Sequence, residues 1–171
     1  FVKALELIQW CDELRIPVLT FWILSTDNLQ RDESELAGLF QVIRDHVAEL
    51  VTPAGVQGLP RRVQAIGQLE LVPPSVREAI LQAEVSTKER ADFYLNVAVA
   101  YDGREEVVDA VRRLIAEQYK QGYPPEDVLN SLSIEEIAKH TYTAYLPDPD
   151  LIIRTSGELR LSGFLLWQSV H

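Results

Sequence analysis

Two arginines near the C-terminal end of the sequence are the residues whose type and spacing indicate chemistry most directly. Arg154 and Arg160 lie six residues apart and flank the turn-forming segment 155–157 (Thr-Ser-Gly). A guanidinium presents N–H donors in a planar fork that matches phosphate oxygens, and the turn adds exposed backbone amides. The apolar run 164–167 follows at once. We therefore predict a binding site for a phosphate or diphosphate carried by an apolar molecule.

A second polar group follows the apolar run 18–24. It consists of Ser25, Thr26, Asp27 and Asn28, whose hydroxyl, carboxylate and amide groups can line a binding site. The same residue types also favour turns and helix caps. Because one turn can serve both purposes, we expect these residues to cap a helix and to face a ligand.

The pattern of apolar residues indicates which elements position these groups. Helical spacing predicts helices at residues 2–14, 32–51, 73–89, 105–119 and 133–140. Short apolar runs predict strands at residues 18–24, 63–69, 93–101 and 151–153. Proline and glycine predict a loop at residues 53–60 and a helix break at residues 122–125. Strands that alternate with helices indicate a single α/β domain over residues 1–171, with a mostly parallel central sheet flanked by helices.

The polar groups share one position relative to the predicted strands. Ser25, Asp102 and Arg154 each come directly after a predicted strand. In open parallel sheets, ligands bind outside the carboxyl ends of the strands. We therefore expect all three segments at one rim of one sheet.

Composition excludes several classes of function. The 171 residues are 47% hydrophobic, enough for one sizeable core, and the formal net charge is −10. Nucleic-acid binding needs a basic face, so we expect no nucleic-acid partner. The single cysteine, Cys11, excludes an intramolecular disulfide and fits the cytoplasm. No apolar run is long enough for a transmembrane segment, and no Gly-rich nucleotide-binding motif occurs.

Three segments, in order, resemble one enzyme family. Residues 148–168, which read PDLIIRTSGELRLSGFLLWQ after Asp148, resemble the last signature of the cis-prenyltransferases, the undecaprenyl diphosphate synthase family. Residues 21–31, with Glu35 beyond them, resemble the middle signature. Residues 95–104 resemble its N-x-A-x-x-Y-G-G-R segment, with Asp102 in place of the first glycine.

The resemblance implies a transferase that joins isopentenyl diphosphate to an allylic diphosphate and forms a cis double bond. It also implies Mg²⁺ as cofactor and a homodimer. It assigns a catalytic role to Asn28, either in proton removal or in substrate positioning. The substrate-binding positions that it implies are Ser25, Thr26, Asp27, Leu29, Arg31, Glu35, Arg154, Arg160, Leu161 and Ser162.

Several positions depart from the family pattern or carry structural expectations. Leu29 replaces a tryptophan, which argues against stacking on the allylic chain. In the third segment, Asn96, Tyr101 and Arg104 match the family, and we interpret them as scaffold close to the site. Histidines occur only at positions 46, 140 and 171, outside any metal-ligand spacing, so we expect structural roles for them.

The metal ligands that the family implies do not occur in this sequence. The family holds Mg²⁺ with an aspartate of an N-terminal signature and with a glutamate that would fall two places beyond His171. We therefore find no metal-binding carboxylate set in residues 1–171. We expect both ligands in segments of the protein outside this sequence.

The side chain at position 23, Ile23, bears on the length of the product. In the family, the residue two places before the signature serine lies on the wall of the prenyl tunnel, and small residues there accompany long products. A branched side chain in a packed apolar wall resists displacement. Ile23 therefore predicts a short product, most simply C15 from geranyl or dimethylallyl diphosphate.

Two other functions remain open from the sequence. One is a catalytically inactive accessory subunit of the same fold, which the absent first signature would favour and Arg160 would oppose. The other is an unrelated α/β phosphate-binding protein, which requires the three ordered matches to be coincidence.

Overall fold

The computed structural model describes residues 2–51, 61–90, 92–158 and 160–170. The chain divides into two compact units, Phe1–Ala100 and Tyr101–His171. The predicted loop at residues 53–60 lies outside the described residues, as does His171.

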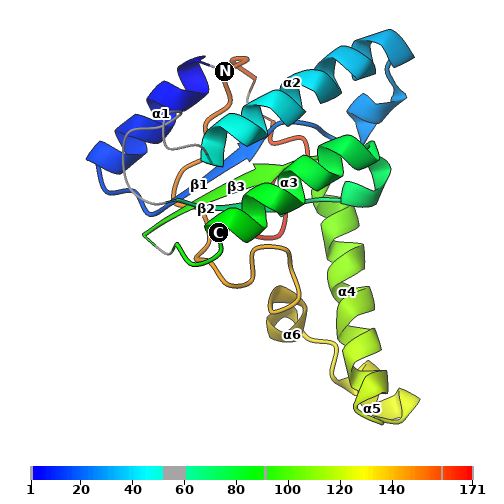
Figure 1. Cartoon of the computed structure of the whole chain (residues 1–171). Helices are drawn as coiled ribbons and strands as arrows, with labels where there is room; N and C mark the ends of the chain where they lie inside the picture. Colours follow the sequence, from blue (N-terminus) through cyan, green and yellow to red (C-terminus); the bar gives the residue numbers. More distant parts are fainter. Residues whose placement is uncertain (1, 52–60, 91, 159, 171) are drawn as a thin grey trace. The chain divides into compact units, whose positions relative to one another are not determined.

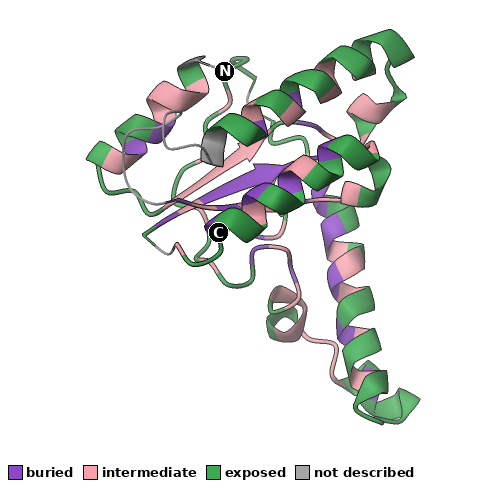
Figure 2. Cartoon of the chain, in the orientation of Figure 1, coloured by how far each residue is buried: buried purple, intermediate pink, exposed green. Residues whose placement is uncertain are grey.

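The first unit is built on a parallel sheet of three strands, β1 (Val18–Trp22), β2 (Arg61–Ile66) and β3 (Phe93–Ala98). The order is β1-β3-β2, and both neighbours run parallel to β3 (Figure 1). The central strand is buried on both faces, with Leu95 and Ala98 fully inaccessible to solvent (Figure 2). The mainly apolar sequence of β3, interrupted by the buried Asn96, follows from this position, since both of its faces are covered. The predicted α/β class with a parallel sheet is confirmed.

Helices flank this sheet. They are α1 (Val2–Glu13), α2 (Glu33–Val51) and α3 (Pro74–Thr87), with short 3₁₀ turns η1 (Asp27–Gln30) and η2 (Leu69–Leu71). Helices α2 and α3 lie side by side, and α3 packs on β2 (Figure 1). Side chains of α3 also accept hydrogen bonds from the outer edge of β2. The Thr87 hydroxyl accepts from Val63 N at 3.0 Å, and the Glu84 carboxylate accepts from Ala65 N at 2.7 Å. The edge strand therefore has partners for these donors.

The carboxyl end of β3 fixes both neighbouring chain segments. The Ala98 carbonyl accepts hydrogen bonds from Ile23 N at 2.9 Å and from Leu24 N at 3.2 Å. On the other side, Ile66 O accepts from Val99 N at 3.0 Å. Gly67 follows with φ +120°, and a Cβ there would lie 2.1 Å from the Val99 carbonyl oxygen. Only glycine fits so close an approach of two backbones.

The second unit contains α4 (Gly103–Lys120), α5 (Pro125–Asn130) and α6 (Ile134–Ala138). Helix α5 was not expected, because its prolines were interpreted only as a break. Proline at the first helical position is compatible with a helix start, since its missing N–H would be unpaired there anyway. The Ser133 hydroxyl accepts from Glu136 N at 3.2 Å, which confirms the predicted cap of α6.

A buried carboxylate holds the second unit together. Glu106 of α4 is fully inaccessible to solvent and accepts three hydrogen bonds. The donors are the Tyr101 hydroxyl at 2.5 Å, Tyr142 N at 2.8 Å and Gln168 Nε2 at 3.0 Å. Burial and the neighbouring Glu106 carboxylate raise the pKa of the Tyr101 hydroxyl. Three donors satisfy the buried charge and connect α4 to segments far along the chain.

The predicted strand at residues 151–153 is wrong for the described residues. The segment is in no ladder, and Leu151 and Ile153 are 74% and 67% exposed. Three residues offer few ladder hydrogen bonds, and Pro147 and Pro149 before them have no N–H to extend a ladder. Within the described ranges, no helix has the length and apolar character needed to cross a bilayer.

His140 predicts a pH dependence of stability. Its Nε2 lies 2.9 Å from the Glu117 carboxylate and its Nδ1 lies 2.7 Å from the Glu136 carbonyl oxygen. The hydrogen bond to the Glu136 carbonyl, then the Glu117 contact, raise the pKa of His140 above its ordinary value near 6.5. Because the folded pKa is the higher one, the stabilisation is fully present below about pH 6.5 and is lost as the pH rises through the folded value.

The change that tests this is His140→Gln. Urea unfolding between pH 5.5 and 8.5 should show wild type more stable at the acid end, by a few tenths to about 1 kcal/mol, with the difference narrowing toward pH 8.5. A difference between wild type and variant that stays constant over this range would contradict the assignment.

Candidate functional site

The segment after β1 forms a turn closed by two side chains. Ser25 N donates to Asn28 Oδ1 at 3.1 Å, and Asn28 N donates to Ser25 Oγ at 3.1 Å. Leu24, just before, is 1% exposed and anchors the turn in the core. Leu29 N donates to the Thr26 carbonyl at 3.1 Å and continues the turn into η1. These residues therefore form the expected turn, whereas Thr26, at the N-cap position of η1, makes no side-chain cap hydrogen bond.

This reciprocal pairing decides what the turn can offer to a ligand. The Asn28 amide oxygen and the Ser25 hydroxyl oxygen both accept backbone hydrogen bonds. Among the described residues, Asn28 Nδ2 donates to none, and the Ser25 hydroxyl hydrogen is likewise a donor with no described acceptor. The turn therefore presents N–H and O–H donors, which suit phosphate oxygens.

The other predicted positions near this turn are either exposed or packed against the core. The Arg31 guanidinium lies 2.5 Å from the Glu35 carboxylate one helical turn on, and both side chains are about half exposed. Asp27 is exposed, whereas Leu29 packs against the core of the first unit. Its packing explains how leucine fills this position without a stacking partner.

In the second unit, Arg154 is the centre of a dense hydrogen-bond cluster. Its Nε donates to Ser156 Oγ at 3.0 Å, and its Nη1 donates to Ser162 Oγ at 2.9 Å and to the Arg160 carbonyl. Ser162 has φ +51°, a conformation that non-glycine residues rarely adopt. Leu161 beside it is 39% exposed. The structure therefore groups the predicted positions Arg154, Arg160, Leu161 and Ser162.

Glu158 pairs with both arginines of this cluster. Its Oε2 lies 3.1 Å from Arg154 Nη2 and 2.8 Å from Arg160 Nη2. An ion pair of Glu158 with one arginine was the structural alternative to a phosphate site, and the structure shows it with both. The carboxylate occupies the point where two guanidinium forks meet, which is the position that an external anion would take.

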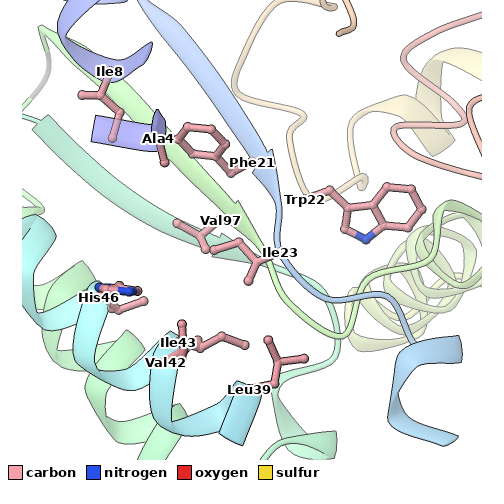
Figure 3. Close-up of a pocket in the computed structure, with 11 residues that line it drawn as sticks. Ala4, Ile8, Phe21, Trp22, Ile23, Leu39, Val42, Ile43, His46 and Val97 are labelled. Atoms are coloured by element: carbon pink, nitrogen blue, oxygen red, sulfur yellow. The ribbon is translucent and has the colours of Figure 1, made fainter. Parts of the chain in front are cut away.

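An apolar pocket of about 230 Å³ lies within the first unit, between α1, α2 and the strands β1 and β3 (Figure 3). Its lining residues are Ala4, Ile8, Phe21, Trp22, Ile23, Leu39, Val42, Ile43, His46, Val47 and Val97. Ile23 is 38% exposed and lies two residues before Ser25. The pocket wall and the donor turn are therefore consecutive on one segment of backbone.

The third family segment behaves as scaffold. Asn96 is fully buried and its Nδ2 donates to Thr20 Oγ1 at 3.1 Å, across the pairing of β3 with β1. Asp102 caps α4 by accepting from Arg104 N at 2.7 Å and also pairs with the Arg104 guanidinium at 3.0 Å. The hydrogen bond from the Arg104 side chain is the main cause of the lowered pKa of Asp102. The aspartate that replaces a family glycine thus engages the neighbouring arginine.

Two features of the structure were not predicted from the sequence. His46 lines the apolar pocket, and its position three residues after Ile43 and four after Val42 on one helical face was the available signal. Glu106 carried no such signal, because an acidic residue in an amphipathic helix predicts a solvent-facing position. In the part of the chain that the structure describes, no group of three or more His, Cys, Asp or Glu residues could hold a metal ion.

Comparisons with known proteins identify the family of the chain. The family described as "Putative undecaprenyl diphosphate synthase" matches residues 1–171. A protein named (2Z,6E)-farnesyl diphosphate synthase from Mycobacterium tuberculosis is 45% identical over 99% of this chain and 63% of its own length. One of the same name from Thermobifida fusca is 47% identical over 99% of this chain and 64% of its own length. The chain thus spans slightly less than two thirds of these curated relatives.

Solved structures extend the comparison. The lavandulyl diphosphate synthase from Lavandula x intermedia, in complex with dimethylallyl diphosphate, has a TM-score of 0.80 and 33% identity, over 94% of this chain and 67% of its own. A "probable undecaprenyl diphosphate synthase" from Campylobacter jejuni has a TM-score of 0.81 and 28% identity, over 100% of this chain and 77% of its own. The family match over the whole chain, and the identity to curated relatives, show that the chain belongs to the undecaprenyl diphosphate synthase family, the cis-prenyltransferases.

Proposed function

We propose that the protein condenses isopentenyl diphosphate with a short allylic diphosphate, forms a cis double bond and releases a short-chain product, C15 above all. The observation that supports this best is the apolar pocket whose wall residue Ile23 leads directly into the donor turn at Ser25 and Asn28. A prenyl diphosphate has these two parts in the same order, a hydrocarbon chain and then a charged head.

The size of the pocket supports a short chain. An apolar cavity of about 150 Å³ accommodates benzene, which has six carbons. At the same ratio, the 230 Å³ of this pocket corresponds to a hydrocarbon of roughly nine carbons. The geranyl group, which one condensation converts to a C15 product, is close to that size.

The polar groups divide between the two diphosphates in this proposal. Arg154, Arg160 and Ser162 would hold the isopentenyl diphosphate through guanidinium and hydroxyl donors. Ser25 and Asn28 would donate to the allylic diphosphate. Of the two roles open for Asn28, we propose positioning, because its amide oxygen already accepts from Ser25 N and its remaining groups are donors.

By analogy with the family, we also propose Mg²⁺ as the cofactor, a homodimer as the assembly and the cytoplasm as the location. The described part of this chain offers no carboxylate cluster that fits a metal, so we assign no ligand and no chemical step to Mg²⁺ here. The buried free thiol of Cys11 supports a reducing compartment.

The test is incubation of the protein with radiolabelled isopentenyl diphosphate, geranyl diphosphate and magnesium, followed by chromatography of the products. We expect a magnesium-dependent C15 diphosphate with a new cis bond. A folded protein that forms no product with any allylic donor would overturn the proposed function and favour an accessory subunit.

Ile23→Ala should lengthen the product. Removing the branched side chain opens the wall of the pocket, so products beyond C15 should become a major fraction by mass spectrometry. Val85→Ala is the matched control, because Val85 is 66% exposed on α3 and is not among the lining residues. An unchanged product with Ile23→Ala would refute the wall assignment.

Glu158→Gln should tighten the binding of inorganic pyrophosphate. The substitution removes the charge that pairs with both arginines, and we expect about three- to tenfold higher affinity by calorimetry. Glu126→Gln, in the first turn of α5, removes an acidic charge without touching this cluster and should leave affinity unchanged. Equal or weaker binding in Glu158→Gln would show that the carboxylate orients the arginines rather than competing for them.

A further inference from the structure

Among the described residues that line the apolar pocket, His46 is the one titratable side chain. The other lining residues are aliphatic or aromatic. Figure 3 shows the imidazole beside Val42 and Ile43, on the face of α2 that borders the pocket. A polar ring in a hydrocarbon-lined wall is unusual because its hydration is lost when an apolar ligand packs against it.

The position of His46 along the pocket is the second observation. Helix α2 begins at Glu33, soon after the donor turn, and contributes Leu39 first and His46 later to the lining. Seven residues of helix span about 10 Å, at about 1.5 Å per residue. Among the labelled residues of α2 in Figure 3, Leu39 and His46 are the two that lie farthest apart. Along α2, His46 and Val47 are therefore the lining residues farthest from the start of the helix, which follows Ser25 and Asn28 in the chain.

The imidazole has a charged neighbour and is partly exposed to water. Its Nδ1 lies 3.5 Å from the Glu49 carboxylate, which is three residues further along α2 and about half exposed. The imidazole side chain is itself 32% exposed, so it borders both the pocket and water. A prenyl chain that grew past this point would remove water from the imidazole and from its carboxylate neighbour.

From these observations we propose that His46 is a specificity-determining residue that sets the far limit of the prenyl chain. It acts through its polarity. Carbons of the chain that pack against the aliphatic wall are stabilised by leaving water, whereas carbons that pack against the imidazole also remove its water and are stabilised less. This inference rests on the proposed prenyl-transfer function and adds a second constraint to Ile23. The two residues act at different places, since Ile23 forms the wall next to the donor turn and His46 closes the remote end.

Paired variants separate polarity from size. His46→Leu replaces the ring with an apolar side chain, whereas His46→Asn keeps a hydrogen-bonding group that can face Glu49. Asp45→Leu places the same leucine one residue away, where the Asp45 side chain is 52% exposed and lies outside the lining. His46→Met is a second apolar replacement, with a flexible side chain, in case leucine disturbs folding.

Product analysis gives the first result. With geranyl diphosphate and excess isopentenyl diphosphate, His46→Leu or His46→Met should raise the ratio of C20 to C15 product about tenfold, equivalent to about 1.4 kcal/mol. His46→Asn and Asp45→Leu should retain the wild-type ratio. An unchanged ratio in both apolar variants, or an equal rise in His46→Asn, would overturn the proposal.

Calorimetry without isopentenyl diphosphate separates this inference from the proposed function. The affinity for farnesyl diphosphate relative to geranyl diphosphate should rise in the two apolar variants by a similar factor. If wild type binds neither compound, the proposed function fails and this inference with it. If wild type binds both and the relative affinity does not change in the variants, the role of His46 alone is refuted.

Discussion

The carboxyl end of the central strand β3 is the constraint on which the candidate site of the first unit depends. The Ala98 carbonyl accepts from both Ile23 N and Leu24 N, so the backbone leaves β1 along a path fixed by β3. On the opposite side, Val99 N and the close approach at Gly67 fix the end of β2. Because β3 is buried on both faces, this anchor is rigid.

That anchor explains how an apolar wall and a polar head group site can be adjacent. Ile23 is directed to the pocket, Leu24 to the core and Ser25 to the turn, within three consecutive residues. Alternation along extended backbone separates the first two, and the reciprocal bonds of Ser25 and Asn28 end the strand. A shift of one residue would exchange wall and core side chains, so the register of β1 on β3 determines the site.

Four arginines of the family segments, one in the first unit and three in the second, share a physical property. Arg31 pairs with Glu35, Arg104 with Asp102, and both Arg154 and Arg160 with Glu158. In a chain of net charge −10, these guanidinium groups therefore have a carboxylate partner before any ligand arrives. Anion binding is an exchange of partners, which favours ligands of high charge density such as a diphosphate over weakly charged anions.

Much of the fold followed from local pattern. The apolar runs of the three strands and the periodicity of α1 to α4 predicted these elements to within a few residues, and the Ser133 cap predicted the start of α6. The run at residues 151–153 failed because a short apolar run does not specify a pairing partner. The sequence located the two arginines through their spacing, but not the contact of Glu158 with both.

Long-range contacts explain the other omissions. Glu106 accepts from Tyr142 and Gln168, which lie 36 and 62 residues further along the chain, and no local pattern indicates such partners. His46 was treated as an ordinary helical residue, although its spacing from Val42 and Ile43 placed it on the apolar face. The role of His46 depends on the strand that forms the opposite wall of the pocket, and helical spacing alone does not identify that strand.

The most direct test of the central claim is a crystal structure of the protein with geranyl thiodiphosphate, which resists turnover. The account predicts the hydrocarbon chain in the pocket beside β1 and α2, its thiodiphosphate accepting from Ser25 Oγ and Asn28 Nδ2, and its last carbons against His46. A hydrocarbon chain bound outside this pocket, with Ile23 and His46 uncontacted, would contradict it.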